Sequence, residues 1–104
     1  MRHADPTPLT SGQRARLRSL AHHLDPLVQI GKHGLTDAVV AASDQALLAH
    51  ELIKVRLAGE REGRDAEARA LAERTGASLV GSIGRIAILY RAHPDPEKRS
   101  IVLD

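Results

Sequence analysis

The chain contains no cysteine, no tryptophan and no phenylalanine, and tyrosine occurs once. Without cysteine there is no disulfide framework, no thiolate nucleophile and no cysteine-bound zinc, which fits a reducing cytoplasm. The near absence of aromatic residues excludes the stacking platforms on which proteins that read single-stranded bases depend. A nucleic-acid binder with this composition would have to recognise mainly backbone and shape.

Long apolar runs are also missing from the sequence. No stretch approaches the roughly 18 apolar residues that a membrane helix requires, and residues 1–8 lack the apolar segment of a signal peptide. We therefore expect neither a membrane partner nor secretion. With 104 residues, of which 42% are hydrophobic and 27% charged, the chain has the composition of one folded domain.

The prolines mark the expected boundaries of that domain. Four of the five lie in the first eight residues or after Ala92, and Pro26 separates two predicted elements. We expect a flexible leader at 1–8, a domain at 9–91 and a loose tail at 92–104.

Hydrophobic periodicity predicts three helices and four strands. Ser11 and Thr36 are the predicted N-caps of the first two helices, and Leu35 and Val40 have the spacing of a hydrophobic staple around the second. The third helix is expected after Gly63 and ends before Gly76. The expected order is αβαβαββ, with helices at 11–24, 37–49 and 63–75 and strands at 27–30, 52–58, 77–83 and 85–91. This order predicts an α/β fold whose four-stranded sheet is mixed, because a terminal hairpin follows a βαβ unit.

The run 52–58 alternates between apolar and charged positions. One face of this strand should pack in the core while the other carries charge. The first face holds Ile53, Val55 and Leu57, and the second holds Leu52, Lys54 and Arg56.

The motif Gly31-Lys32-His33-Gly34 lies where a predicted strand leads into a helix N-terminus. Backbone N–H groups are unpaired there, and the helix dipole favours anions. Glycines let a phosphate approach the backbone closely, and Lys32 adds a positive charge. The motif therefore predicts a phosphate-binding loop, although two glycines can also serve a tight turn alone. His33 could contact a phosphate or ribose or remain solvated.

Positive charge accumulates on the same side of the chain as this loop. Residues 1–56 hold seven Lys and Arg against five acids, whereas residues 57–104 hold eight against eight. The first helix has no acidic residue between Ser11 and Leu24, and helical geometry places its cations on two flanks. Arg14, Arg18 and His22 share one flank, and Arg16 and His23 share the other. Singly these are ordinary surface charges, but with Lys54 and Arg56 they predict a basic patch.

The sequence lacks the minimal motifs of the common enzyme classes. The sequence has no HExxH, no Walker loop, no GxSxG and no paired cysteines, so we expect no catalytic residue, no metal and no cofactor. Adjacent His22 and His23 point about 100° apart on a helix and make a poor metal pair. His50 is expected to be partly buried, and the run 81–85 is interpreted as a hairpin turn.

The ordered set of motifs resembles the bacterial YhbY family, the stand-alone form of the CRM domain, from about Leu9 to Arg91. The resemblance rests on Leu9-Thr10, Gln13-Arg14, Leu17-Arg18, Leu20-Ala21-His22, Leu24, Pro26, Ile30 through Thr36, Ala46-Leu47, His50 through Val55, Thr75-Gly76-Ala77, Ile83-Gly84 and Leu89-Tyr90-Arg91. The family is named for chloroplast RNA splicing and ribosome maturation.

This resemblance implies a fold similar to the C-terminal domain of translation initiation factor 3, and a GxxG loop comparable in role to that of KH domains. It also implies a partner, the rRNA of precursors of the large ribosomal subunit, for a protein expected to be cytoplasmic and monomeric. The carried-over RNA-binding residues are Gly31, Lys32, His33, Gly34, Arg14, Arg18, His22, Lys54 and Arg56. The rival hypothesis is a protein-interaction module whose basic face docks on an acidic ribosome-associated partner.

Overall fold

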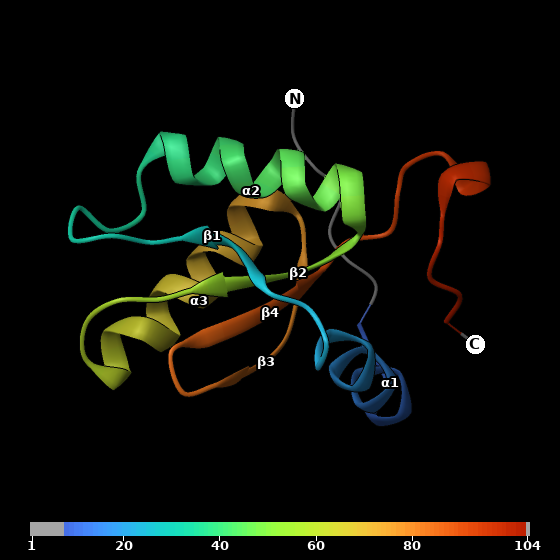
Figure 1. Ribbon diagram of the computed structural model, residues 1–104, viewed down its shortest axis with the longest axis horizontal. Coiled ribbons are helices and arrows are strands. Elements are labelled where there is room, and N and C mark those ends of the chain that lie inside the picture. Colours follow the sequence, from blue (N-terminus) through green and yellow to red (C-terminus); the bar gives the residue numbers. More distant parts are fainter. Residues whose placement is uncertain (1–7, 104) are drawn as a thin grey trace.

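A computed structural model describes residues 8–103, so the expected leader lies outside the described residues except for Pro8. The elements follow the predicted order (Figure 1). They are α1 (Ser11–Ala21), β1 (Pro26–Gln29), α2 (Asp37–His50), β2 (Leu52–Arg56), α3 (Arg61–Thr75), β3 (Ser78–Ile83), β4 (Ile86–Tyr90) and a final 3-10 turn, η1 (Pro96–Lys98). The strand order is β1-β2-β4-β3, with β1 and β2 parallel and the other pairs antiparallel. The predicted mixed sheet is confirmed, while the likeness to the initiation factor domain stays a prediction.

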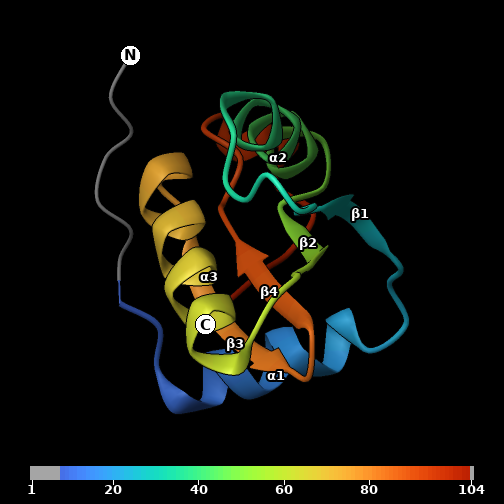
Figure 2. The same cartoon turned by 90° about the vertical axis from the view of Figure 1, so that its left-hand side faces the viewer.

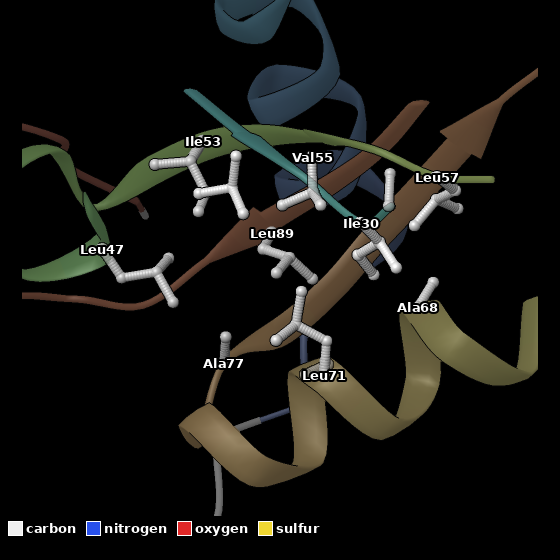
Figure 3. Close-up of a cluster of buried hydrophobic side chains, with 12 residues drawn as sticks. Ile30, Leu47, Ile53, Val55, Leu57, Ala68, Leu71, Ala77 and Leu89 are labelled. Carbon is white, nitrogen blue, oxygen red and sulfur yellow. The ribbon is translucent and has the colours of Figure 1, made fainter. Parts of the chain in front are cut away.

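Helices cover both faces of the sheet, α2 and α3 on one face and α1 on the other (Figure 2). The alternation in β2 explains how one sheet serves two cores, because its successive side chains point to opposite faces. Ile53 and Val55 are buried under α2 and α3, and Leu52 is buried on the α1 side. Figure 3 shows Ala68 and Leu71 of α3 pointing toward the strands in the larger core.

The first helix is shorter than predicted, and Ser11 is not its N-cap. Thr10 caps it: its hydroxyl accepts from the Gln13 N–H at 3.1 Å, and the Gln13 side chain accepts from the Thr10 N–H at 3.0 Å. The helix ends at Ala21 rather than Leu24. Because Pro26 disfavours a helical conformation in the residue before it, the chain must become extended by Asp25.

The other elements differ from prediction mainly at their ends. Thr36 caps α2 as predicted, accepting from the Val39 N–H at 3.2 Å. The third helix begins at Arg61, so Gly63 lies inside its first turn, and it ends at Gly76 with a left-handed φ of 69°. His50 is exposed, so the prediction that it is partly buried is wrong. The hairpin predicted near Gly84 is confirmed.

The segment after Arg91 is bound to the domain, so the expectation of a loose tail is wrong. It is anchored by Glu51, whose side chain is 2% exposed. This carboxylate accepts hydrogen bonds from the backbone N–H groups of His93, Ser100 and Ile101 and from the Ser100 hydroxyl. Burial by itself would raise the pKa of Glu51, but these hydrogen bonds outweigh it and hold the pKa below its ordinary value. No local sequence pattern predicts this contact, because the partners lie 42 to 50 residues after Glu51.

Candidate nucleic-acid interface

The Gly31–Gly34 loop joins the end of β1 to the N-terminus of α2. The Gly34 N–H donates to the Gly31 carbonyl at 3.0 Å and closes a turn, and the Thr36 N–H donates to the Gly34 carbonyl at 3.1 Å. Within residues 8–103 no partner accepts from the backbone N–H groups of Lys32 and His33, and both residues are exposed. The loop therefore presents free N–H groups and a lysine charge to solvent, as an anion site requires.

The two glycines of the loop have different structural roles. Gly34 has a φ of +72°, a conformation that L side chains rarely adopt. Gly31 has no such constraint, and a Cβ added to it would meet nothing within 4 Å. Gly34 is thus needed for the turn itself, whereas Gly31 leaves the loop backbone open to an approaching ligand.

The cations of α1 divide into a structural and an exposed group. Arg14 is half-buried, and its Nη1 donates to the carbonyls of Leu79 at 2.8 Å and Val80 at 3.0 Å. The pairing of β3 with β4 shifts register between Leu79 and Gly81, which is the irregularity of a β-bulge. The guanidinium of Arg14 thus ties α1 to this bulge, a structural role that the sequence did not predict.

Arg18 lies one turn farther along the same flank of α1, and His22 is the C-cap that follows the helix. Both are exposed. The Cδ of Arg18 is 3.9 Å from the place that a Cβ on Gly81 would take. The carbonyl of His22 accepts from the Lys54 Nζ at 3.5 Å. The C-terminal end of α1 and the α1-facing side of β2 therefore share a cationic surface. Arg16 and His23 are exposed as well, but His23 lies in the turn after the helix rather than on its second flank as predicted.

Arg56 connects this surface to the glycine loop. Its carbonyl accepts from the Ile30 N–H at 2.8 Å, which places the end of β2 beside the residue that precedes Gly31. Its exposed side chain follows the alternation of β2 onto the α1 face. The loop leads into α2 on the opposite face (Figure 2), and that it forms one patch with the cations of the α1 face stays a prediction. We call this set of exposed and half-exposed residues the basic track: Arg18, His22, Lys54, Arg56, Lys32 and His33.

Sequence reasoning missed two features that involve α3, whose charges nearly cancel. The Glu67 Oε2 lies 3.3 Å from where a Cβ on Gly34 would be. A shallow cleft of about 390 Å³ also opens between the start of α3 and the β3–β4 turn. It is lined by Arg61, Arg64, Asp65, Ser82 and Gly84. No local pattern signals either feature, since only the fold brings α3 to these loops.

Metal binding and membrane insertion were also examined for the described part of the chain. No group of three or more His, Cys, Asp or Glu side chains among residues 8–103 could hold a metal ion. His22 and His23 form an edge-on ring contact with centroids 5.2 Å apart. In the same range of residues, no helix has the length and apolarity to span a membrane.

Comparisons with known proteins show which family the chain belongs to. The chain is 43% identical over 91 residues to a probable RNA-binding protein of Pseudomonas aeruginosa, covering 86% of this chain and 88% of the relative. It is 45% identical over 86 residues to an RNA-binding protein of Haemophilus influenzae, covering 82% and 87% respectively. The solution structure of a Staphylococcus aureus protein superposes with a TM-score of 0.78 at 34% identity, covering 91% of this chain and all of the other. The family model of the CRS1/YhbY (CRM) domain matches residues 9–91, and this chain therefore belongs to that family.

Proposed function

We propose that this protein binds structured RNA, with phosphates of the RNA backbone held by the Gly31–Gly34 loop and the basic track. The observation that carries the proposal is the loop itself, in which the N–H groups of Lys32 and His33 have no acceptor within residues 8–103 and the exposed Lys32 adds a positive charge just before α2. Helix N-termini and free amide clusters favour anions, and cationic side chains supply most of the affinity for nucleic-acid backbones. The names of the relatives support RNA as the anion.

Recognition is expected to depend on backbone and shape rather than on base stacking. Tyr90 is the one residue of the Phe, Trp and Tyr types in the sequence. It is 8% exposed and packs in the smaller core between α1 and the sheet, which we call the α1 core. Because an aromatic ring must be accessible to stack on a base, Tyr90 cannot serve as a stacking platform. Phosphate contacts fix position without reading sequence, so the affinity should vary little with base sequence.

At the level of the cell, we propose a non-enzymatic assembly factor that acts as a monomer in the cytoplasm on the rRNA of the pre-large ribosomal subunit. This part rests on the resemblance to YhbY proteins described above. The contacting residues in this proposal are those of the basic track, with Gly31 and Gly34 shaping the loop.

The direct test is an RNA-binding titration at several salt concentrations. With roughly four to seven phosphates neutralised, the logarithm of the affinity should fall against the logarithm of salt with a slope of several units. The variant Lys32→Ala should weaken binding by a similar factor for different RNA sequences. A flat salt response, or a loss that depends on sequence, would contradict backbone recognition by this loop.

A second candidate function is docking of the basic face on an acidic protein partner. The observation that favours it is a set of exposed leucines where α1 leads into β1: Leu20, Leu24 and Leu27 are 40%, 38% and 55% exposed. Apolar side chains next to cations are common at protein interfaces. Nuclease digestion of a lysate separates the two functions, because co-migration with pre-large-subunit particles survives the loss of RNA only if a protein holds the chain.

A further inference from the structure

Glu67 brings a negative charge to the glycine loop from a distant part of the chain. It lies on α3 just before Ala68, which is 1% exposed and packed against the sheet. Glu67 is half-buried at the edge of that packed face, and its Oε2 is 3.3 Å from the position of a Cβ on Gly34. A larger residue than glycine at position 34 would therefore meet a carboxylate, so Glu67 lies against the turn that Gly34 forms.

The Glu67 carboxylate has no partner in the described part of the chain. Within residues 8–103 no hydrogen bond or ion pair involves the Glu67 side chain, although Lys32 lies only two residues before Gly34. A carboxylate offers about four lone-pair sites for donors. Its acceptor capacity is therefore left for the ligand or for water.

An unpaired carboxylate beside a phosphate-binding loop weakens phosphate binding by repulsion between like charges. The repulsion is offset if the same ligand also carries a hydrogen-bond donor close to the phosphate. The ribose 2′-hydroxyl is such a donor, since it lies next to the carbon that bears the 3′ phosphate. Deoxyribose lacks it, and this hydroxyl is the group by which proteins tell RNA from DNA.

We propose that Glu67 makes the loop selective for ribose by accepting a hydrogen bond from the 2′-hydroxyl of the nucleotide whose phosphate lies on the loop. The inference rests on the proposed function and adds a specificity-determining residue to it. The Lys32 and His33 N–H groups hold the phosphate, and the Glu67 carboxylate holds the sugar next to it. DNA brings the phosphate but leaves the carboxylate unpaired.

The test measures the affinity of the full chain for one RNA hairpin and for the same hairpin with 2′-O-methyl groups. The methylated probe keeps the phosphates and the A-form helix but removes the donor. The wild-type chain should prefer the RNA by about tenfold, since a hydrogen bond to a charged group is worth at least that factor. Glu67→Ala should reduce the preference to within about twofold. Glu67→Gln, which keeps an acceptor oxygen without the charge, should fall between them.

The matched control is Glu73→Gln, which removes the same charge from an exposed position on α3. It should keep the wild-type preference for RNA. If Glu67→Ala strengthens binding of both hairpins equally, or leaves their ratio unchanged, the carboxylate does not read the sugar and the inference is wrong. Failure of the proposed function is a different result: Gly31→Ala and Lys32→Ala would then leave RNA binding unchanged.

Discussion

Glu51 accepts two hydrogen bonds from Ser100, one from the backbone N–H at 2.7 Å and one from the hydroxyl at 3.0 Å, across 49 residues of sequence. Glu51 lies between α2 and β2, and its backbone has a φ of +65°, which is uncommon for glutamate. The four hydrogen bonds that it accepts explain why this conformation is kept. The contact also makes the C-terminal segment part of the folded domain, since Ile101 and Leu103 pack on the α1 core.

Replacing this carboxylate should destabilise the domain. Glu51→Gln keeps the size but changes one acceptor oxygen to a donor, which then faces other donors, and the loss of free energy of unfolding should be about 1–3 kcal/mol. Chemical denaturation of the two proteins at neutral pH measures this difference. Glu97→Gln, which changes an exposed carboxylate in the same segment, should stay within about 0.5 kcal/mol of the wild type. Equal stability of Glu51→Gln and the wild type would show that the segment does not depend on Glu51.

Stability should also depend on pH through Glu51. The pKa of this carboxyl in the folded state lies below its ordinary value of 4.5. The folded state therefore favours the ionised form, and its stabilisation is complete above about pH 4.5 and lost as the pH falls through the folded pKa. Denaturation curves at about pH 7, 4 and 3 should show a steeper loss of stability below about pH 4.5 for the wild type than for Glu51→Gln. Parallel losses in both proteins would assign the acid sensitivity to other groups.

The two loop glycines should respond differently to alanine. Gly34→Ala places a Cβ at a φ of +72° and 3.3 Å from the Glu67 Oε2, and should destabilise the domain by about 1–2 kcal/mol. Gly31→Ala meets nothing within 4 Å and should leave the free energy of unfolding within about 0.5 kcal/mol of the wild type. It should nevertheless weaken RNA binding, because the added methyl obstructs the approach of a phosphate. Thermal unfolding and an RNA titration of each variant measure both effects. Normal RNA affinity of Gly31→Ala would argue against a phosphate at the loop backbone.

Two arginines of α1 should likewise differ, one affecting stability and the other RNA binding. Arg14→Ala leaves the carbonyls of Leu79 and Val80 without their donor and should lower the free energy of unfolding by about 1–3 kcal/mol. Arg18→Ala should leave stability nearly unchanged and reduce the salt slope of RNA binding by about one unit. Denaturation and salt titrations of the pair distinguish a structural from a ligand-binding arginine. The assignment fails if Arg14→Ala is as stable as the wild type, or if Arg18→Ala keeps the full salt slope.

The sequence determined the features that depend on neighbouring residues. The alternation in 52–58 places Ile53 and Val55 in one core and Leu52 in the other, because side chains of a strand point to alternate faces. Thr36 as N-cap and the glycine loop before it follow from side-chain chemistry within a few positions. The order of elements then restricts the sheet topology, since crossovers are short and right-handed.

Only the tertiary structure decided which charged groups are free to bind a ligand. Arg14 and Arg18 are equivalent in sequence, four residues apart on one helix flank, yet only Arg14 reaches the carbonyls of β3, 65 and 66 residues later. Glu67 likewise belongs by sequence to a helix of balanced, solvated charges, and only the fold places it beside Gly34. Local periodicity reaches three or four residues along the chain, whereas hydrogen bonds and charges act between whatever groups the packed layers bring together.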